Sequence, residues 1–388
     1  MTNTETVKGF QDFLGPEARK REKIRKIIQE QFELYGFEPA ETPIIEQEEF
    51  VRGENPNDEA VRDVFRLQDR GERKLALRYE FTFQLKRIAK NQKLPYKRYQ
   101  IGYVFRDEPI RKGRARQFIQ CDADVIGSTV KDEAEILSLG KKVFEKLGMP
   151  VKIYVNNRKL INEIMVAENI EEKNRGIVIR ELDKLDKLSK KEVADNLKKY
   201  GAEKLVKIFE QPEKEFEKYG FYKEIKELKK YCKIYGVAVE FRPYLARGLS
   251  YYNGTVFEIW SEELNVSISG GGSYLIGGAQ STGFALGLEP ISLLTKIEGD
   301  NTQVQIISVG QDDEAIRITE KLRENKVSVI VVLDKAPGKA IEYANSKGIG
   351  KVIFVGKDEV ESKKFKLKDM KTGKESVVSE SKLVESFQ

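Results

Sequence analysis

Residues that could act on a phosphate group gather between positions 97 and 126. Two strand patterns, 97–106 and 117–126, are joined by a basic loop containing glycine, which predicts an antiparallel hairpin with a long tip. Gln120, Asp122 and Asp124 alternate along the second strand, so their side chains should share one face. Clustered cations beside a carboxylate suit phosphoryl or nucleotidyl transfer, because negative charge develops on phosphate oxygens. The charged residues that frame this candidate site are Arg106, Glu108, Arg111, Lys112, Arg114 and Arg116.

The same alternation has a second interpretation, because polar residues along one face of a sheet usually contact solvent. On spacing alone, a solvated sheet face and the floor of a polar pocket are both open.

Composition excludes several kinds of catalysis. The chain contains no histidine and only two cysteines, Cys121 and Cys232, which are far apart. Ser–His–Asp and Cys–His catalysis, His-ligated metals and a disulfide framework are therefore excluded. Any chemistry must use carboxylates, Lys, Arg, Tyr, backbone groups or bound Mg²⁺.

Size and charge indicate a folded, soluble protein of two or three domains. Of the 388 residues, 40% are hydrophobic and 34% are charged, a balance typical of globular rather than disordered chains. The net charge of +6 permits a polyanionic partner, although a Lys/Glu-rich surface is also typical of thermostable proteins.

No apolar run approaches the ~20 residues that span a bilayer. The N-terminus has no apolar segment, so we expect no signal peptide and a cytoplasmic protein without a membrane partner.

The order of elements predicts an α+β protein. A helix over 15–36 precedes the hairpin, and a helix over 131–147 and a strand over 151–155 follow it. Helical spacing dominates 157–235, strands with glycine-rich turns at 270–272 and 277–278 follow, and a short helix covers 291–297. A linker at 299–302 precedes a small β-α-β-α-β domain with a mostly parallel sheet. We therefore expect three parts: a core formed by residues 1–156 and 236–300, a helical insertion at 157–235 and an α/β domain at 301–388.

Nucleotide-binding motifs of other folds are missing. There is no GxxxxGK[ST], and no GxGxxG follows a strand. The GGGSYLIGG stretch lies within a β region, so it indicates turns and close backbone approach rather than a phosphate cradle.

Several segments in the same order resemble class II aminoacyl-tRNA synthetases, specifically the archaeal and eukaryotic form of the histidyl-tRNA synthetase family. FRDEPIRKGRARQFIQCDADVIG is similar to motif 2, and GFALGLEP is similar to motif 3. YGFEPAETPIIE resembles motif 1, whose proline (here Pro43) lies at a dimer interface. VKGFQDF, LALRYEFT, ELDKLDKL and LARGLSYYNGTVFE resemble further family segments, and the C-terminal tail resembles the class IIa anticodon-binding domain. Independent motifs in register across nearly the whole chain make the resemblance specific.

The resemblance implies an antiparallel catalytic sheet with a helical insertion and a C-terminal anticodon-binding domain. It implies a homodimeric histidine–tRNA ligase that uses ATP and Mg²⁺, with L-histidine and tRNA(His) as substrates. Arg106 and Arg247 would act on the α-phosphate, Glu108 would contact the adenine side and Arg114 the outer phosphates. The implied substrate-binding residues are Glu80, Gln120 and Thr82 at the amino group, and Asp124, Tyr251, Tyr252 and Tyr274 around the imidazole. Without the motif, ordinary core or interface aromatics would be the favoured interpretation of Tyr251 and Tyr252.

Four positions depart from the family pattern. Pro290 stands where motif 3 has an arginine that clamps the γ-phosphate, and Ser250 stands where the RGLDYY motif has aspartate. Ser273 and Leu275 replace an arginine and an aspartate beside Tyr274. These changes leave a second hypothesis open, a non-catalytic paralogue that senses histidine as a regulatory subunit or binds tRNA. A third is a synthetase for proline, threonine or glycine, which Asp124 and the tyrosines disfavour.

Overall fold

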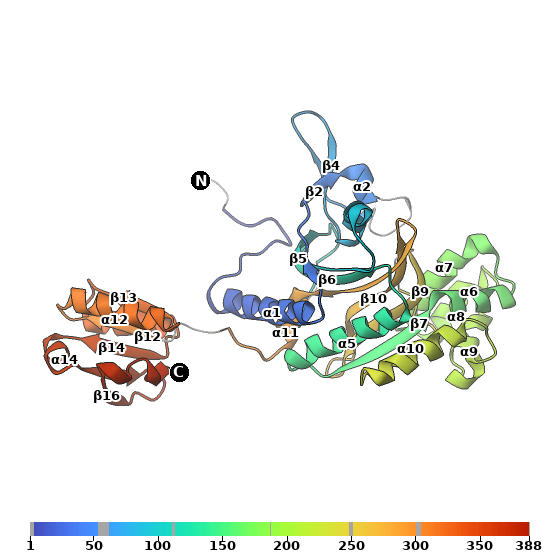
Figure 1. Cartoon of the computed structure of the whole chain (residues 1–388). Coiled ribbons are helices and arrows are strands. Elements are labelled where there is room, and N and C mark those ends of the chain that lie inside the picture. The colour runs from blue at the N-terminus through green and yellow to red at the C-terminus, as the bar shows by residue number, and fades with distance from the viewer. Residues whose placement is uncertain are drawn as a thin grey trace. The chain divides into compact units, whose positions relative to one another are not determined.

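The computed structural model describes residues 4–52, 62–110, 113–186, 188–247, 251–299 and 304–387. The chain divides into two compact units, coloured along the chain in Figure 1. The larger unit comprises Met1–Asp12 and Ile24–Ile297, and the smaller comprises Phe13–Lys23 and Glu298–Gln388.

An eight-stranded sheet with the order β1-β5-β6-β11-β10-β9-β7-β8 forms the larger unit. Its central pairs are antiparallel, and only the short edge strands β1 and β8 pair in parallel. This arrangement confirms the expected α+β class. The strands are β1 (Glu38–Pro39), β5 (Tyr96–Phe105), β6 (Gln117–Ile126), β7 (Val151–Asn157), β8 (Glu240–Phe241), β9 (Tyr252–Ser261), β10 (Val266–Ile276) and β11 (Ala279–Gly287).

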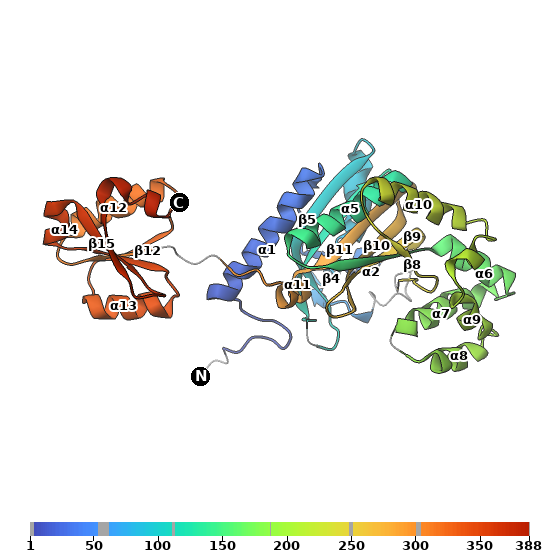
Figure 2. The same cartoon turned by 90° about the horizontal axis from the view of Figure 1, so that it is seen from below.

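Helices α1 (Gly15–Leu34), α5 (Val130–Lys146) and α10 (Tyr222–Ile234) pack on one face of this sheet (Figures 1 and 2). Apolar side chains at helical spacing make the contact, and Ile24, Ile28 and Phe32 of α1 are fully buried. The odd-numbered residues in the middle of the hairpin join the same core: Tyr99 and Ile101 of β5, and Ile119, Cys121, Ala123 and Val125 of β6. By the alternation of a strand, the even-numbered residues must lie on the opposite face.

The β5–β6 hairpin forms as predicted. Tyr96 pairs with Ile126 and Phe105 with Gln117, without a register shift between them. The register places Arg98 opposite Asp124, and Gln100 opposite Asp122. Gln120, Asp122 and Asp124, which the sequence singled out for chemistry, therefore share one face of the hairpin with Arg98 and Gln100.

The predicted turn at 270–272 is wrong, because these glycines lie inside β10. Their small size serves close contacts instead. A Cβ built on Gly271 would lie 2.0 Å from the carbonyl oxygen of Gly283, and one on Gly270 would lie 2.4 Å from Nη1 of Arg247. The second predicted turn, at Gly277 and Gly278, does connect β10 to β11, and both glycines have positive φ.

Residues 158–216 form a helical segment with a hydrophobic core of its own. Apolar side chains of this segment cluster with Tyr222, Ile225 and Ala246. Helix α10, which the sequence assigned to the same insertion, also packs Leu228 and Cys232 into the core beneath the main sheet. The helices of the segment are α6 (Arg158–Ala167), α7 (Glu172–Leu182), α8 (Lys190–Lys198) and α9 (Lys204–Phe209), with 3₁₀ turns η2 (Asp183–Asp186) and η3 (Glu213–Phe216).

A second sheet, with the order β2-β4-β3, lies between α1 and the hairpin in the chain. Arg87 and Glu46 join it to the following helix through two hydrogen bonds of 2.9 and 2.8 Å. The remaining elements of this unit are β2 (Ile45–Gln47), α2 (Glu48–Arg52), β3 (Arg66–Gln68), β4 (Lys74–Leu77), α4 (Thr82–Ile88), η1 (Ala89–Asn91) and α11 (Leu288–Leu294).

The smaller unit contains a five-stranded sheet with the order β13-β12-β14-β15-β16. The strands β13, β12 and β14 are parallel, but β14, β15 and β16 pair antiparallel, so the expected mostly parallel sheet is only half correct. The sequence pattern missed the terminal hairpin. The elements are β12 (Val304–Ser308), α12 (Asp312–Glu324), β13 (Val329–Val332), α13 (Pro337–Ser346), β14 (Lys351–Val355), α14 (Lys357–Ser362), β15 (Lys364–Asp369), β16 (Glu375–Ser379), η4 (Glu380–Lys382) and η5 (Glu385–Phe387).

Candidate active site

The polar face of the β5–β6 hairpin is buried, which excludes the solvated interpretation of its alternation. Gln120, Asp122 and Asp124 of β6 are at most 5% exposed, and Arg98 of β5 is fully buried. Burying charged groups is costly unless they are paired or hydrogen-bonded. Each of these groups therefore requires a charged or hydrogen-bonding partner.

Arg106, Gln120 and Asp122 form a hydrogen-bonded chain across this face. Arg106 Nη2 donates to Oε1 of Gln120 at 3.1 Å, and Gln120 Nε2 donates to Oδ2 of Asp122 at 3.0 Å. The Arg106 guanidinium also lies 4.3 Å from the ring centre of Tyr79 and 5.0 Å from that of Phe118. Burial, the charge of Asp124 and that of Glu80 raise the pKa of Asp122 well above its ordinary value. These hydrogen bonds thus hold the Arg106 guanidinium and the Gln120 amide in fixed orientations.

Asp124 is held between an arginine and a tyrosine. Its Oδ2 lies 2.9 Å from Nη2 of Arg98, and its Oδ1 accepts a short hydrogen bond from the hydroxyl of Tyr274. A side chain at Gly283, its cross-strand neighbour, would collide with this carboxylate. Burial raises the pKa of Asp124, although Arg98 and the Tyr274 hydroxyl act in the opposite direction. The result is an oriented acid with a buried counter-charge.

Three tyrosines form a cluster next to this acid. The rings of Tyr251 and Tyr252 have centres 4.7 Å apart, and Tyr274 lies 5.5 Å from Tyr251 and 6.4 Å from Tyr252. Burial, followed by the charge of nearby Glu80, raises the pKa of Tyr251 well above its ordinary value. Glu80 is itself 4% exposed. The structure therefore brings Glu80, Asp124 and all three tyrosines into one neighbourhood.

Arg247 lies beside the same cluster. Its Nη1 donates to Oε1 of Glu258 at 2.8 Å, and its guanidinium packs against Gly270. Burial acts to lower the pKa of Arg247, but the neighbouring Tyr252 and Glu258 outweigh it and raise the pKa above the ordinary arginine value. Arg247 is thus a permanently charged group directed at the tyrosine side of the site.

The other predicted residues lie nearer the rim. Arg114 has a side chain 62% exposed and lies 3.4 Å from Glu108, so its guanidinium is open to solvent. Thr82 begins α4 and is partly buried. Arg116 pairs with Asp107 at 3.1 Å rather than facing Asp124 or the tyrosines. Arg111 and Lys112 lie outside the described residues.

The departures from the family pattern have definite surroundings. Pro290 is in the first turn of α11, and a Cβ built on Gly113 of the hairpin tip would lie 4.0 Å from it. Ser273 is buried and donates a hydrogen bond to Glu133, whose pKa burial raises. Leu275 is 53% exposed. Ser250 lies outside the described residues.

Sequence reasoning missed the residues that support the site. Arg98 occurs in KRYQIGYVFR at even spacing with Gln100, and the hairpin register would have placed it opposite Asp124. Glu258 follows the tyrosine motif at the spacing of a strand, and its carboxylate joins Arg247 to the indole of Trp260 at 2.8 Å. Glu133 of α5 carried no local signal, because its partners Thr255 and Ser273 lie more than a hundred residues away.

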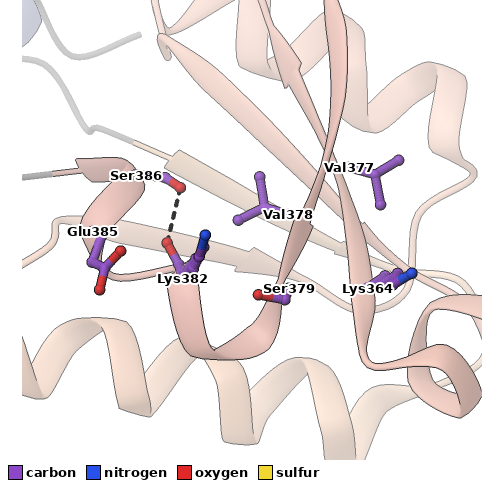
Figure 3. Close-up of a pocket in the computed structure, with 7 residues that line it drawn as sticks. All are labelled: Lys364, Val377, Val378, Ser379, Lys382, Glu385 and Ser386. Atoms are coloured by element: carbon purple, nitrogen blue, oxygen red, sulfur yellow. Dashed lines mark hydrogen bonds between the residues drawn. The ribbon is translucent and has the colours of Figure 1, made fainter.

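The smaller unit has a pocket of its own, with a volume of about 640 Å³, between β15, β16 and the last turns of the chain (Figure 3). None of the predicted site residues lines it. Its lining residues are Lys364, Val377, Val378, Ser379, Lys382, Glu385 and Ser386.

Two sequence families match the chain. The family described as histidyl-tRNA synthetase matches residues 9–291, and the anticodon binding domain matches residues 303–388. A histidine–tRNA ligase of Bacillus cereus is 34% identical over 417 residues, covering 97% of this chain and 95% of the relative. The histidine–tRNA ligase of Nanoarchaeum equitans is 32% identical over 375 residues, covering 91% of each chain.

Solved structures agree with these matches. A histidyl-tRNA synthetase from a Nostoc species superposes with a TM-score of 0.88 at 26% identity, covering 100% of this chain and 99% of that one. A Bacillus halodurans protein described as an ATP phosphoribosyltransferase regulatory subunit/histidyl-tRNA synthetase shares the fold, with a TM-score of 0.80 at 22% identity over 92% of this chain. The family match over both units, together with relatives above 30% identity along nearly the full length, shows that the chain belongs to the histidyl-tRNA synthetase family.

Proposed function

We propose that this chain is a histidine–tRNA ligase, which activates histidine with ATP and transfers the histidyl group to tRNA(His). The observation that carries the proposal is the buried site, in a chain whose family is established, that holds two arginines, oriented carboxylates and tyrosines together. Fold alone would not support an activity, but the site adds the chemistry.

Activation is an in-line attack of the histidine carboxylate on the α-phosphorus of ATP. A new O–P bond forms while the bond from the α-phosphorus to the pyrophosphate oxygen breaks, and no protein nucleophile is needed. Arg106 and Arg247 would stabilise the charge that develops on the α-phosphate oxygens. Gln120 and Glu80, supported by Thr82, would bind the α-amino group. The absence of histidine side chains is therefore no obstacle.

The imidazole of the substrate would contact Asp124 and the tyrosines. Arg98 orients the Asp124 carboxylate, and Tyr274 donates to it in the structure. A buried carboxylate and hydroxyls left without partners would strongly disfavour an apolar analogue. Tyr252 and Tyr251 would complete the walls of this pocket.

ATP would lie along the hairpin, with Glu108 toward the adenine and Arg114 toward the outer phosphates. Among the described residues, no group of three or more His, Cys, Asp or Glu side chains could hold a metal by itself. Mg²⁺ commonly binds through substrate phosphates, waters and one or two carboxylates. Glu289, which accepts a hydrogen bond from the backbone N–H of Ile119 at 3.2 Å, is a carboxylate near the hairpin. When bound, Mg²⁺ would neutralise phosphate charge.

Oligomeric state, location and domain roles are inferred from the family. We propose a cytoplasmic homodimer in which the segment around Pro43 lies at the interface, and the neighbouring Ile44 and Ile45 are 44% and 50% exposed. Residues 1–156 and 236–300 would form the catalytic core, 157–235 the insertion, and 301–388 the domain that binds the tRNA(His) anticodon. None of the described helices is long and apolar enough to cross a membrane.

The first test is ATP–pyrophosphate exchange by the purified chain with each of the standard amino acids in turn. We expect exchange with histidine alone, because Asp124 and the tyrosines require a polar ring. Exchange with proline, threonine or glycine would retain the class but contradict the substrate. Histidine binding without any exchange would contradict the ligase and support a histidine-sensing paralogue; tRNA binding alone would support a tRNA-binding one.

Pro290→Arg should lower the KM for ATP about fivefold, because it restores a cation near the hairpin tip where the family clamps a phosphate. A solvent-accessible contact of this kind contributes about 1 kcal/mol. Pro290→Gln is the matched control, since it removes the proline ring without adding charge, and its KM should equal that of the wild type. An unchanged KM in Pro290→Arg would mean that another group already occupies the clamp position.

A further inference from the structure

The backbone of Arg247 adopts an uncommon conformation. Its φ is 60°, in the left-handed region that residues with side chains seldom occupy. Such a conformation persists only where surrounding structure holds it in place. The source of this support bears on catalysis, because the guanidinium of Arg247 depends on where its backbone lies.

Two oppositely charged residues hold the peptide group that enters Arg247. Arg158 Nη1 donates to the carbonyl oxygen of Ala246 at 3.0 Å, and the N–H of Arg247 donates to Oδ1 of Asp183 at 3.1 Å. These two bonds engage opposite sides of the same peptide unit. Burial lowers the pKa of Arg158 and the charge of Asp183 raises it, which indicates that the two side chains interact.

Both residues belong to the helical segment rather than to the main sheet. Arg158 begins α6, and Asp183 begins η2, within the ELDKLDKL run. Ala246 is fully buried in the core of that segment, and Phe241 stacks edge-on with Phe216 at 5.1 Å. The strand-to-loop connection that carries Arg247 is thus anchored in the helical segment.

The side chain of Arg247 is held from the other direction. Glu258 of β9 accepts a hydrogen bond from Nη1 of Arg247, and Gly270 of β10 leaves room for the guanidinium. The backbone is therefore positioned by the helical segment, and the guanidinium by the sheet. If either support is lost, the charge should move from its place beside the tyrosines.

We propose that Arg158 and Asp183 are positioning residues for Arg247, so that the helical segment sets the geometry of activation. This inference rests on the proposed function for its effect on rate. Neither residue need touch histidine or ATP. Losing either of their hydrogen bonds to the backbone should therefore lower kcat rather than change the KM of either substrate. A misplacement of about 1 Å at a reacting group can cost about a hundredfold in rate.

The test compares kcat and KM for histidine-dependent exchange in four variants. Asp183→Ala and Arg158→Met should each lower kcat ten- to a hundredfold, with both KM values within about threefold of wild type. Asp183→Asn retains an acceptor oxygen and should keep at least a third of the wild-type kcat. Asp195→Ala, which removes an exposed partner of Lys198 elsewhere in the segment, should leave kcat unchanged. Wild-type kcat in both Asp183→Ala and Arg158→Met, or an equal loss in Asp183→Asn, would overturn the proposal.

A second readout is independent of activity. Trp260 is the single tryptophan of the chain, and its indole shares Glu258 with Arg247. Asp183→Ala and Arg158→Met should therefore change the emission of Trp260, whereas Asp195→Ala should not. If the wild type shows no exchange, the proposed function fails, but the emission of Trp260 still tests whether Arg158 and Asp183 position Arg247. Unchanged emission in both Asp183→Ala and Arg158→Met would overturn that proposal.

Discussion

Arg106→Ala should lower the rate of histidine-dependent ATP–pyrophosphate exchange about a hundred- to a thousandfold, and Arg247→Ala should do the same. Arg106 lies against the rings of Tyr79 and Phe118 and donates a hydrogen bond to Gln120, so its guanidinium is held in one place. Removing one preorganised donor to a developing oxyanion typically costs about 3–4 kcal/mol. The loss should appear in kcat and in kcat/KM alike, because the interaction strengthens in the transition state.

The controls separate charge, geometry and folding. Arg106→Lys keeps the charge but loses the planar fork, so its activity should lie between those of the wild type and the alanine variant. Arg73→Ala removes an arginine that is 71% exposed and paired with Asp69 on the surface, and exchange should be unchanged. Oligomeric state and melting temperature should match the wild type in all variants. Exchange at the wild-type rate in Arg106→Ala or in Arg247→Ala would show that the site is assigned to the wrong residues.

Local pattern was sufficient for most of the fold. The alternation of 97–106 and 117–126 predicted β5 and β6 to within a residue, because one face of this hairpin is apolar and the other polar. The glycines at 270–272 were misinterpreted as a turn because glycine marks both turns and close packing. Only tertiary structure distinguishes the two cases, here through the approach of Gly283 and Arg247. The terminal hairpin was missed because KLKDMKTGKESVV is too polar to show a clear strand period.

The candidate site was predictable where residues are close in sequence and hidden where they are not. Gln120, Asp122 and Asp124 share a strand, and their common face follows from its pleat. Arg98 could have been found from the hairpin register, which needs only the pairing of two adjacent strands. The contact between Asp183 and Arg247 spans 64 residues and joins a 3₁₀ turn to a loop. No periodicity relates such positions, so only the folded chain shows that they meet.

The pair formed by Arg98 and Asp124 links histidine recognition to stability, and the two effects can be separated. Arg98 is fully buried, and Asp124 is its charged partner at 2.9 Å. Asp124→Asn would leave a buried guanidinium without a counter-ion, which typically costs about 3–5 kcal/mol. Burial, the largest cause of the raised pKa of Asp122, remains in this variant, so Asp122 should replace the lost counter-charge only in part. Asp124→Asn should therefore lower both the free energy of unfolding and kcat/KM for histidine, the latter at least about a hundredfold.

Adding Arg98→Met to Asp124→Asn should restore the free energy of unfolding to within about 1 kcal/mol of wild type, without restoring the activation of histidine. An apolar replacement of a buried ion pair is often neutral or stabilising, and the double variant removes both charges of the pair. Denaturation followed by Trp260, which lies in β9 of the same sheet, reports on the catalytic unit rather than on both units together. Completing the cycle with Arg98→Met alone gives the coupling between the two side chains. Recovery of histidine activation in the double variant would show that Asp124 does not contact the imidazole, whereas a double variant as unstable as Asp124→Asn would show that the unpaired Arg98 is not the cause of the loss.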